Sequence, residues 1–112
     1  MMQNLQLDLQ NYLEKAIEAA QAAQVIIQDY YHRYEKNPEV FYKSDESPVT
    51  QADIDTESKI KAILQASFPD HGFYGEELGQ EGIDRPFLWL IDPIDGTKAY
   101  VRRYPIFSTQ IA

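Results

Sequence analysis

WLIDPIDGTKAY, residues 89–100, begins as an apolar run and then breaks into two aspartates followed by a glycine and a threonine. The apolar run from residue 87 to 91 predicts a buried strand, and Pro93 stiffens the segment after it. In a turn at the strand end, the carboxylates of Asp92 and Asp95 can point into one pocket. Two close carboxylates repel unless a cation lies between them, and Mg²⁺ prefers oxygen ligands. A plain Asp-Pro and Asp-Gly turn joining two strands explains these residues equally well.

The two residues after Asp95 suit a phosphate ligand. Gly96 allows the backbone to come close to a ligand. If Gly96 and Thr97 open a helical turn, free backbone N–H groups there can hold a phosphate. The hydroxyl of Thr97 can also orient a water molecule.

A second acidic motif, Gly75-Glu76-Glu77, follows an earlier apolar segment in the same manner: strand, glycine, acid. Acids from two strand ends that meet at one edge can form a two-metal site, in which paired cations bind the attacking water and the leaving oxygen. The alternative is a solvated acidic loop, because Glu-Glu before a glycine-rich segment usually has no other role.

A third motif is Thr50-Gln51-Ala52-Asp53. Its local interpretation is a capping box, in which Thr50 caps a helix and Asp53 is the acid at the third helical position. Asp53 could also accept a hydrogen bond from Thr97, and a threonine held by a carboxylate is a good relay to a water nucleophile. Lys43 is a surface lysine by default, or an electrostatic partner for the acidic cluster. His32 and His71 have no metal-ligand spacing and are interpreted as surface or turn residues.

Hydrophobic periodicity predicts two helices followed by strands. The first helix spans about residues 5–33, with an apolar stripe at Leu9, Leu13, Ala16, Ala20, Ala23, Ile27 and Tyr31. The second spans about 51–67, with a stripe at Ile60, Ile63, Leu64 and Phe68. Strands are predicted at 73–74, 87–91 and 107–111, with a polar loop over 78–86. This order predicts an α+β or layered α/β fold.

Composition excludes several classes of function. The chain has 112 residues, is 44% hydrophobic and carries a net charge of -8, so it can form one small domain with a core. Its acidity argues against binding to nucleic acid and to anionic membranes. There is no cysteine, which excludes disulfides and a thiol nucleophile. The N-terminus does not read as a signal peptide, so the cytoplasm is the default location.

Three motifs in order carry a resemblance to a known family. They are KSDESPVTQAD (43–53), GEE (75–77) and WLIDPIDGT (89–97). Their sequence and spacing resemble the inositol monophosphatase superfamily. The resemblance implies an αβαβα layered sandwich, of which this chain would be the N-terminal half, with two long helices packed on a largely antiparallel sheet. It also implies a Mg²⁺-dependent, lithium-sensitive phosphomonoesterase.

The resemblance assigns roles by position. Glu76, Asp92 and the carbonyl of Ile94 would hold a first metal, and Asp92 and Asp95 would share a second. Thr97 with Asp53 would activate the water nucleophile. The N–H groups of Gly96 and Thr97 would bind the phosphate. The supporting residues would be Lys43 and Glu77.

The motifs leave the branch of the superfamily open. They resemble the histidinol-phosphatase and inositol-monophosphatase branches most, and Lys98 also occurs in the bisphosphate-nucleotidase branch. The resemblance implies another metal-binding aspartate in a downstream Trp-Asp motif, so we expect residues 1–112 to be one truncated, metal-binding domain with little activity alone. It also implies that the protein could form a homodimer. The competing hypothesis is a non-catalytic acidic module that binds a cation.

Overall fold

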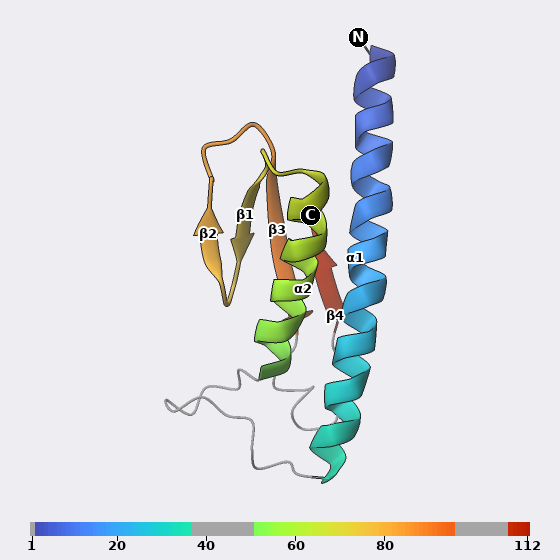
Figure 1. Ribbon diagram of the computed structural model, residues 1–112, viewed down its shortest axis with the longest axis vertical. Helices are drawn as coiled ribbons and strands as arrows, with labels where there is room; N and C mark the ends of the chain where they lie inside the picture. Colours follow the sequence, from blue (N-terminus) through green and yellow to red (C-terminus); the bar gives the residue numbers. More distant parts are fainter. Residues whose placement is uncertain (1, 37–50, 96–107) are drawn as a thin grey trace.

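The computed structural model describes residues 2–36, 51–95 and 108–112. These residues contain two helices and four strands. Helices α1 (Met2–Lys36) and α2 (Gln51–Ser67) precede strands β1 (Gly72–Gly75), β2 (Gly79–Glu81), β3 (Leu88–Asp95) and β4 (Ser108–Ile111). The strands form one sheet in the order β2-β1-β3-β4. Figure 1 shows this arrangement of helices and strands. The layered α/β class predicted from the sequence is confirmed.

Both predicted helices are present, and α1 is longer than expected at each end. It contains no glycine or proline, and its many alanines favour the helical state. Its buried face carries Ala19, Ala23 and Ile27. The predicted stripe is wrong at Leu9 and Leu13, which are exposed, and at Ala20. The first turns of α1 extend past the sheet and α2, so apolar side chains there have no neighbouring layer (Figure 1).

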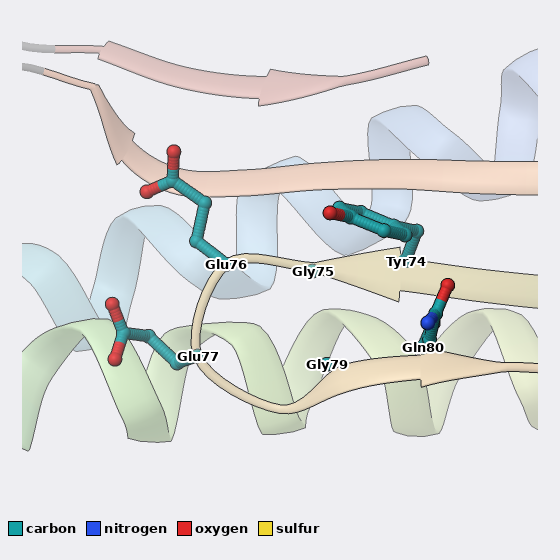
Figure 2. A pocket seen from close by; sticks show the side chains of 6 residues that line it. All are labelled: Tyr74, Gly75, Glu76, Glu77, Gly79 and Gln80. Atoms are coloured by element: carbon teal, nitrogen blue, oxygen red, sulfur yellow. The ribbon is translucent and has the colours of Figure 1, made fainter.

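The core lies between the helices and one face of the sheet. Both helices lie on the same side of the strands (Figure 2), with α2 in contact with β3 and α1 in contact with β4. The residues that fill this layer are Ala19, Ala23, Ile27, Ala52, Ile60, Leu64, Phe73, Trp89 and Ile91. Alternation along the strands puts Tyr74, Leu88 and Leu90 on the other face, where they are exposed. Within the described residues, neither helix is long and apolar enough to cross a membrane.

The sheet is mixed, because its central pair is parallel. Strand β1 pairs antiparallel with β2 and parallel with β3, and β3 pairs antiparallel with β4. Strand β2 was not expected, since it lies inside the predicted loop 78–86. Its sequence, GQE, has no strand character of its own. It forms because the chain reverses after Gly75 and Gly79 adopts a positive φ of 79°, which glycine tolerates.

Residues 82–87 carry the chain from β2 to β3 across the start of β1. The backbone N–H of Gly72 donates to the carbonyl of Phe87 at 2.8 Å. The guanidinium of Arg85 donates to the carbonyl of His71 at 2.8 Å. A Cβ atom on Gly72 would lie 2.2 Å from the carbonyl oxygen of Gly82, so only glycine fits there. This short crossing makes β3 start beside the start of β1 and run parallel to it.

His71 is buried at the bend between α2 and β1, where the sequence predicted a surface or turn histidine. Its Nδ1 accepts a hydrogen bond of 2.9 Å from the indole N–H of Trp89. The ring stacks on Phe68, with centroids 4.9 Å apart, and meets Tyr12 edge-on at 5.0 Å. Nδ1 is therefore unprotonated, and burial lowers the pKa of His71 from its ordinary value of 6.5, although Asp70 opposes the shift.

This lowered pKa predicts stability that falls on acidification. Above about pH 6.5, His71 is neutral in both the folded and the unfolded chain. Below that pH the unfolded chain takes up a proton that the folded imidazole resists, so the free energy of unfolding decreases. We expect His71→Asn to remove this part of the slope between pH 7 and 5, because the Asn oxygen can accept the Trp89 hydrogen bond without titrating. Urea unfolding of both chains at several pH values checks this, and equal slopes would contradict it.

Candidate functional site

The site begins with two acidic residues, one directly after β1 and the other within β3. These strands are parallel neighbours, and the register pairs Gly75 with Ile91. The next residue on each strand is an acid, Glu76 after β1 and Asp92 within β3. Neighbouring strands lie roughly 4.8 Å apart, so the register alone places these two positions side by side. The predicted pattern of strand, glycine and acid at residues 72–77 is confirmed.

Glu76 and Asp92 line one pocket of about 310 Å³ at this edge of the sheet. The apolar part of its lining includes Leu90 and Ile111. A second hollow, of about 540 Å³, lies beside it over the β1–β2 turn and is lined by Tyr74, Gly75, Glu76, Glu77, Gly79 and Gln80. In Figure 2 the Glu76 side chain points toward the carboxyl end of β3, whereas the Glu77 side chain extends in another direction. Glu76 is therefore the member of the acid pair that shares a pocket with Asp92.

The segment from Asp92 to Asp95 is strand, not the turn that the sequence predicted. Strand β3 continues to Asp95, and its pairing with β4 shifts register between Asp92 and Asp95. Pro93 explains the shift, because it has no N–H to donate and sits in strands only at edges or irregularities. The Pro93 side chain is fully buried, and its carbonyl accepts a hydrogen bond of 2.7 Å from the hydroxyl of Thr109. A bulged strand, rather than a loop, thus carries the two aspartates.

The other predicted site residues fall into two groups. Asp53 is buried in the first turn of α2, where the helix dipole favours a negative charge. The backbone of Ile94 and Asp95 lies in β3. The predictions for Lys43, Gly96 and Thr97, and the capping role of Thr50, lie outside the described residues. The contact proposed between Thr97 and Asp53 therefore stays a prediction.

Carboxylate oxygens make this edge suitable for a hard cation. Glu76 and Asp92 offer only oxygen atoms, which is the donor set that Mg²⁺ binds through one or two carboxylates while it keeps several waters. Among the side chains that the structure describes, no three His, Cys, Asp or Glu residues form a ready-made metal group. The two acids in one pocket fit Mg²⁺, and further ligands would come from the backbone or from side chains outside that set.

Glu57 was not identified from the sequence, and the structure places it directly behind the acidic turn. It is 1% exposed, on the buried face of α2. Its carboxylate accepts hydrogen bonds from two successive backbone N–H groups, that of Glu77 at 3.0 Å and that of Leu78 at 2.6 Å. One signal could have revealed it. Glu57 lies four residues after Asp53 and three before Ile60, so a charged residue occupies the apolar stripe of α2.

Burial raises the pKa of Glu57 above its ordinary value, because desolvation disfavours the charged carboxylate. The N–H groups of Glu77 and Leu78 oppose this shift, while the nearby Glu77 charge adds to it and Lys61 opposes it. The net result is a carboxyl group that holds its proton more tightly than a solvated glutamate does.

Comparison with known proteins supports a family assignment. The sequence model of the inositol monophosphatase family matches residues 8–112. A histidinol-phosphatase of Chlorobaculum parvum is 38% identical over 100 residues, which are 89% of this chain. The solved structure of inositol monophosphatase from Anabaena superposes with a TM-score of 0.74 and 36% identity over 93% of this chain. A protein of Pasteurella multocida that is named Nus factor SuhB is 39% identical over 101 residues, which are also 89% of this chain.

These matches cover only part of each relative. The chain spans 38% of the length of the Chlorobaculum and Pasteurella proteins and 35% of the Anabaena chain. The matched part contains the acidic strand ends described above.

The hydrogen bond to Pro93 predicts a measurable role for Thr109 in stability. Thr109→Val keeps the shape but removes the hydroxyl, and leaves the Pro93 carbonyl without this donor. We expect the free energy of unfolding to fall by about 1 kcal/mol, measured by urea unfolding. Thr109→Ser retains the hydroxyl and is the matched control. Equal stabilities of the valine and serine variants would contradict a role for this hydrogen bond.

Proposed function

Because the chain belongs to the inositol monophosphatase family, we propose that it supplies the metal-binding acids of a Mg²⁺-dependent, lithium-sensitive phosphomonoesterase. The substrate would be a small phosphate monoester of the inositol-1-phosphate or histidinol-phosphate type. Residues outside 1–112 would complete the site, which is consistent with the chain's 38% coverage of the Chlorobaculum relative.

The observation that carries this proposal is the register of β1 and β3. It brings Glu76, directly after β1, level with Asp92 within β3, and both residues line one pocket. Two carboxylates that line one pocket repel each other, and a divalent cation between them removes that repulsion. A solvated acidic loop, the alternative reading of Glu76 and Glu77, would not require either acid to share a pocket with β3.

The residues of the chain would divide the work of phosphate hydrolysis. Glu76, Asp92, Asp95 and the carbonyl of Ile94 would hold the cations. When bound, Mg²⁺ would supply charge neutralisation for the phosphate oxygens and a lower pKa for water. Thr97, hydrogen-bonded to Asp53, would orient the attacking water. Its hydroxyl would accept the proton of that water and pass a proton on to the Asp53 carboxylate. The N–H groups of Gly96 and Thr97 would bind the phosphate, with Lys43 and Glu77 nearby.

Two other functions remain candidates. A nucleotide bisphosphate as substrate keeps the same acids and changes only the contacts to the organic group. A non-catalytic, cation-binding role also keeps the same acids, and the Pasteurella relative carries the name of a Nus factor, which specifies no phosphatase activity. Thr97 distinguishes this role from hydrolysis, since a structural cation site needs no hydroxyl beside the bound water.

Metal affinity tests the site without relying on turnover. We expect Glu76→Gln to weaken Mn²⁺ binding, measured by electron paramagnetic resonance, by more than the 10–100-fold typical for loss of an outer partner. Glu81→Gln is the matched control, because it removes the same negative charge from another position of the β1–β2 hairpin. Glu81 contacts Lys61 and Gln65 instead of the pocket. Equal Mn²⁺ affinity in the two variants would contradict a ligand role for Glu76.

Phosphate release tests the reaction and its substrate. We expect the full-length gene product to release phosphate from inositol-1-phosphate or histidinol phosphate with Mg²⁺, and to be inhibited by Li⁺. Asp95→Asn should abolish release, and residues 1–112 alone should show little or none. Adenosine bisphosphate as the best substrate would favour the nucleotidase alternative. A folded, Mg²⁺-binding protein that hydrolyses none of the three would indicate the non-catalytic role.

A further inference from the structure

Three backbone positions around Glu76 are held by a single buried side chain. The Glu57 carboxylate accepts hydrogen bonds from the N–H groups of Glu77 and Leu78. On the other side of Glu76, the same carboxylate lies against Gly75. A Cβ atom built on Gly75 would lie 2.3 Å from the Glu57 carboxyl carbon. Glu57 thus contacts the residues before and after Glu76 without contacting the pocket.

We propose that Glu57 is the positioning residue for Glu76, and that it fixes the turn of residues 75–78 so that the Glu76 carboxylate is presented beside Asp92. This inference rests on the proposed metal site. The backbone sets the direction of a side chain, and Glu57 contacts the backbone on both sides of Glu76. Hydrogen bonds from N–H groups to a carboxylate are stronger than those to a neutral acceptor, so Glu57 is suited to hold this turn rigid.

Other contacts of the hairpin do not replace Glu57. At the far end of β2, Glu81 pairs with Lys61 at 3.4 Å and accepts from Gln65 at 3.1 Å. The side chains of Lys61 and Glu81 are 25% and 47% exposed, and ion pairs with this access to solvent contribute little to rigidity or stability. They also act on Glu81, which lies at the opposite end of the strand from the acidic turn. The backbone N–H groups of the turn itself donate to Glu57 instead.

The test is Glu57→Gln, which keeps the shape of the side chain. Glutamine replaces one carboxylate oxygen with an –NH₂ group, which is a donor, so it cannot accept at both atoms as the carboxylate does. We expect a 10–100-fold loss of Mn²⁺ affinity and faster amide hydrogen exchange at Glu77 and Leu78. Glu14→Gln on α1 removes the same charge far from the turn and should change neither quantity.

The outcomes separate this inference from the proposed function. If Mn²⁺ binds through Glu76 in the parent protein, and Glu57→Gln loosens the turn but binds with parent affinity, the positioning role is overturned and the metal site stands. Loss of affinity with unchanged exchange at Glu77 and Leu78 would also overturn it, because the effect would then be one of charge alone. If the parent binds no Mn²⁺, or binds it independently of Glu76, the proposed site itself fails and the positioning role fails with it.

A second variant keeps the test valid if Glu57→Gln does not fold. Gly75→Ala retains every carboxylate but places a methyl group where the Glu57 carboxylate lies. The carboxylate must then move from the N–H groups of Glu77 and Leu78. We expect the same direction of change in Mn²⁺ affinity and in amide exchange. Parent values for both quantities in Gly75→Ala would overturn the positioning role.

Discussion

The parallel pairing of β1 with β3 is the constraint on which the site depends. Antiparallel neighbours would put the ends of these strands at opposite edges of the sheet. Parallel strands put both carboxyl ends at one edge, and the register brings Glu76 level with Asp92. No helix is needed to connect these parallel strands. Strand β2 returns the chain to the start of β1, and residues 82–87 lead from there to the start of β3. Gly72 permits that crossing, since any side chain would collide with the carbonyl of Gly82.

Side chains along one row of helix α2 contact the hairpin formed by β1 and β2. Asp53, Glu57, Lys61 and Gln65 recur every four residues and so lie along one face of the helix. Glu57 binds the turn after β1, while Lys61 and Gln65 contact Glu81 on β2. Ile60 and Leu64 lie beside Glu57 on the buried side of α2 and belong to the same core cluster as Phe73 and Ile91 of the sheet. The same helix therefore supplies part of the core and fixes the edge where the candidate site lies.

Elements with strong local signals could be predicted from the sequence, and those that depend on pairing could not. The alanine-rich α1, the apolar stripe of α2 and the apolar run of β3 are local patterns. Strand β2 exists only because β1 lies beside it. Its residues Gly79–Glu81 have no strand preference. The bulged path of β3 through Pro93 depends on its pairing with β4, and so a turn was predicted there. The exposure of Leu9 and Leu13 depends on how far the sheet extends along α1, which periodicity does not contain.

The site residues also divide into those with a local sequence pattern and those whose partners are set only by the fold. The acids at strand ends could be found, because strand, glycine and acid is a sequential pattern. Glu57 could not be assigned a partner, since Glu77 and Leu78 lie some twenty residues away and are joined to it only by the fold. His71 looked like an unremarkable turn residue for the same reason, as its partner Trp89 is brought to it by the crossing of residues 82–87.

Glu57 also shows a conflict between stability and placement. Burial raises its pKa even though the N–H groups of Glu77 and Leu78 stabilise the charged form, so this carboxylate lies where its charge is disfavoured. An apolar side chain at this position would avoid that cost and would extend the stripe formed by Ile60 and Leu64. It could not accept hydrogen bonds from the N–H groups of Glu77 and Leu78, and the turn would lose both of these links to α2. Residues that break a local rule are expected where function needs a fixed geometry. The rule is that charged side chains are excluded from a helix–sheet interface. Glu57 breaks it directly behind Glu76, the acid that shares a pocket with Asp92.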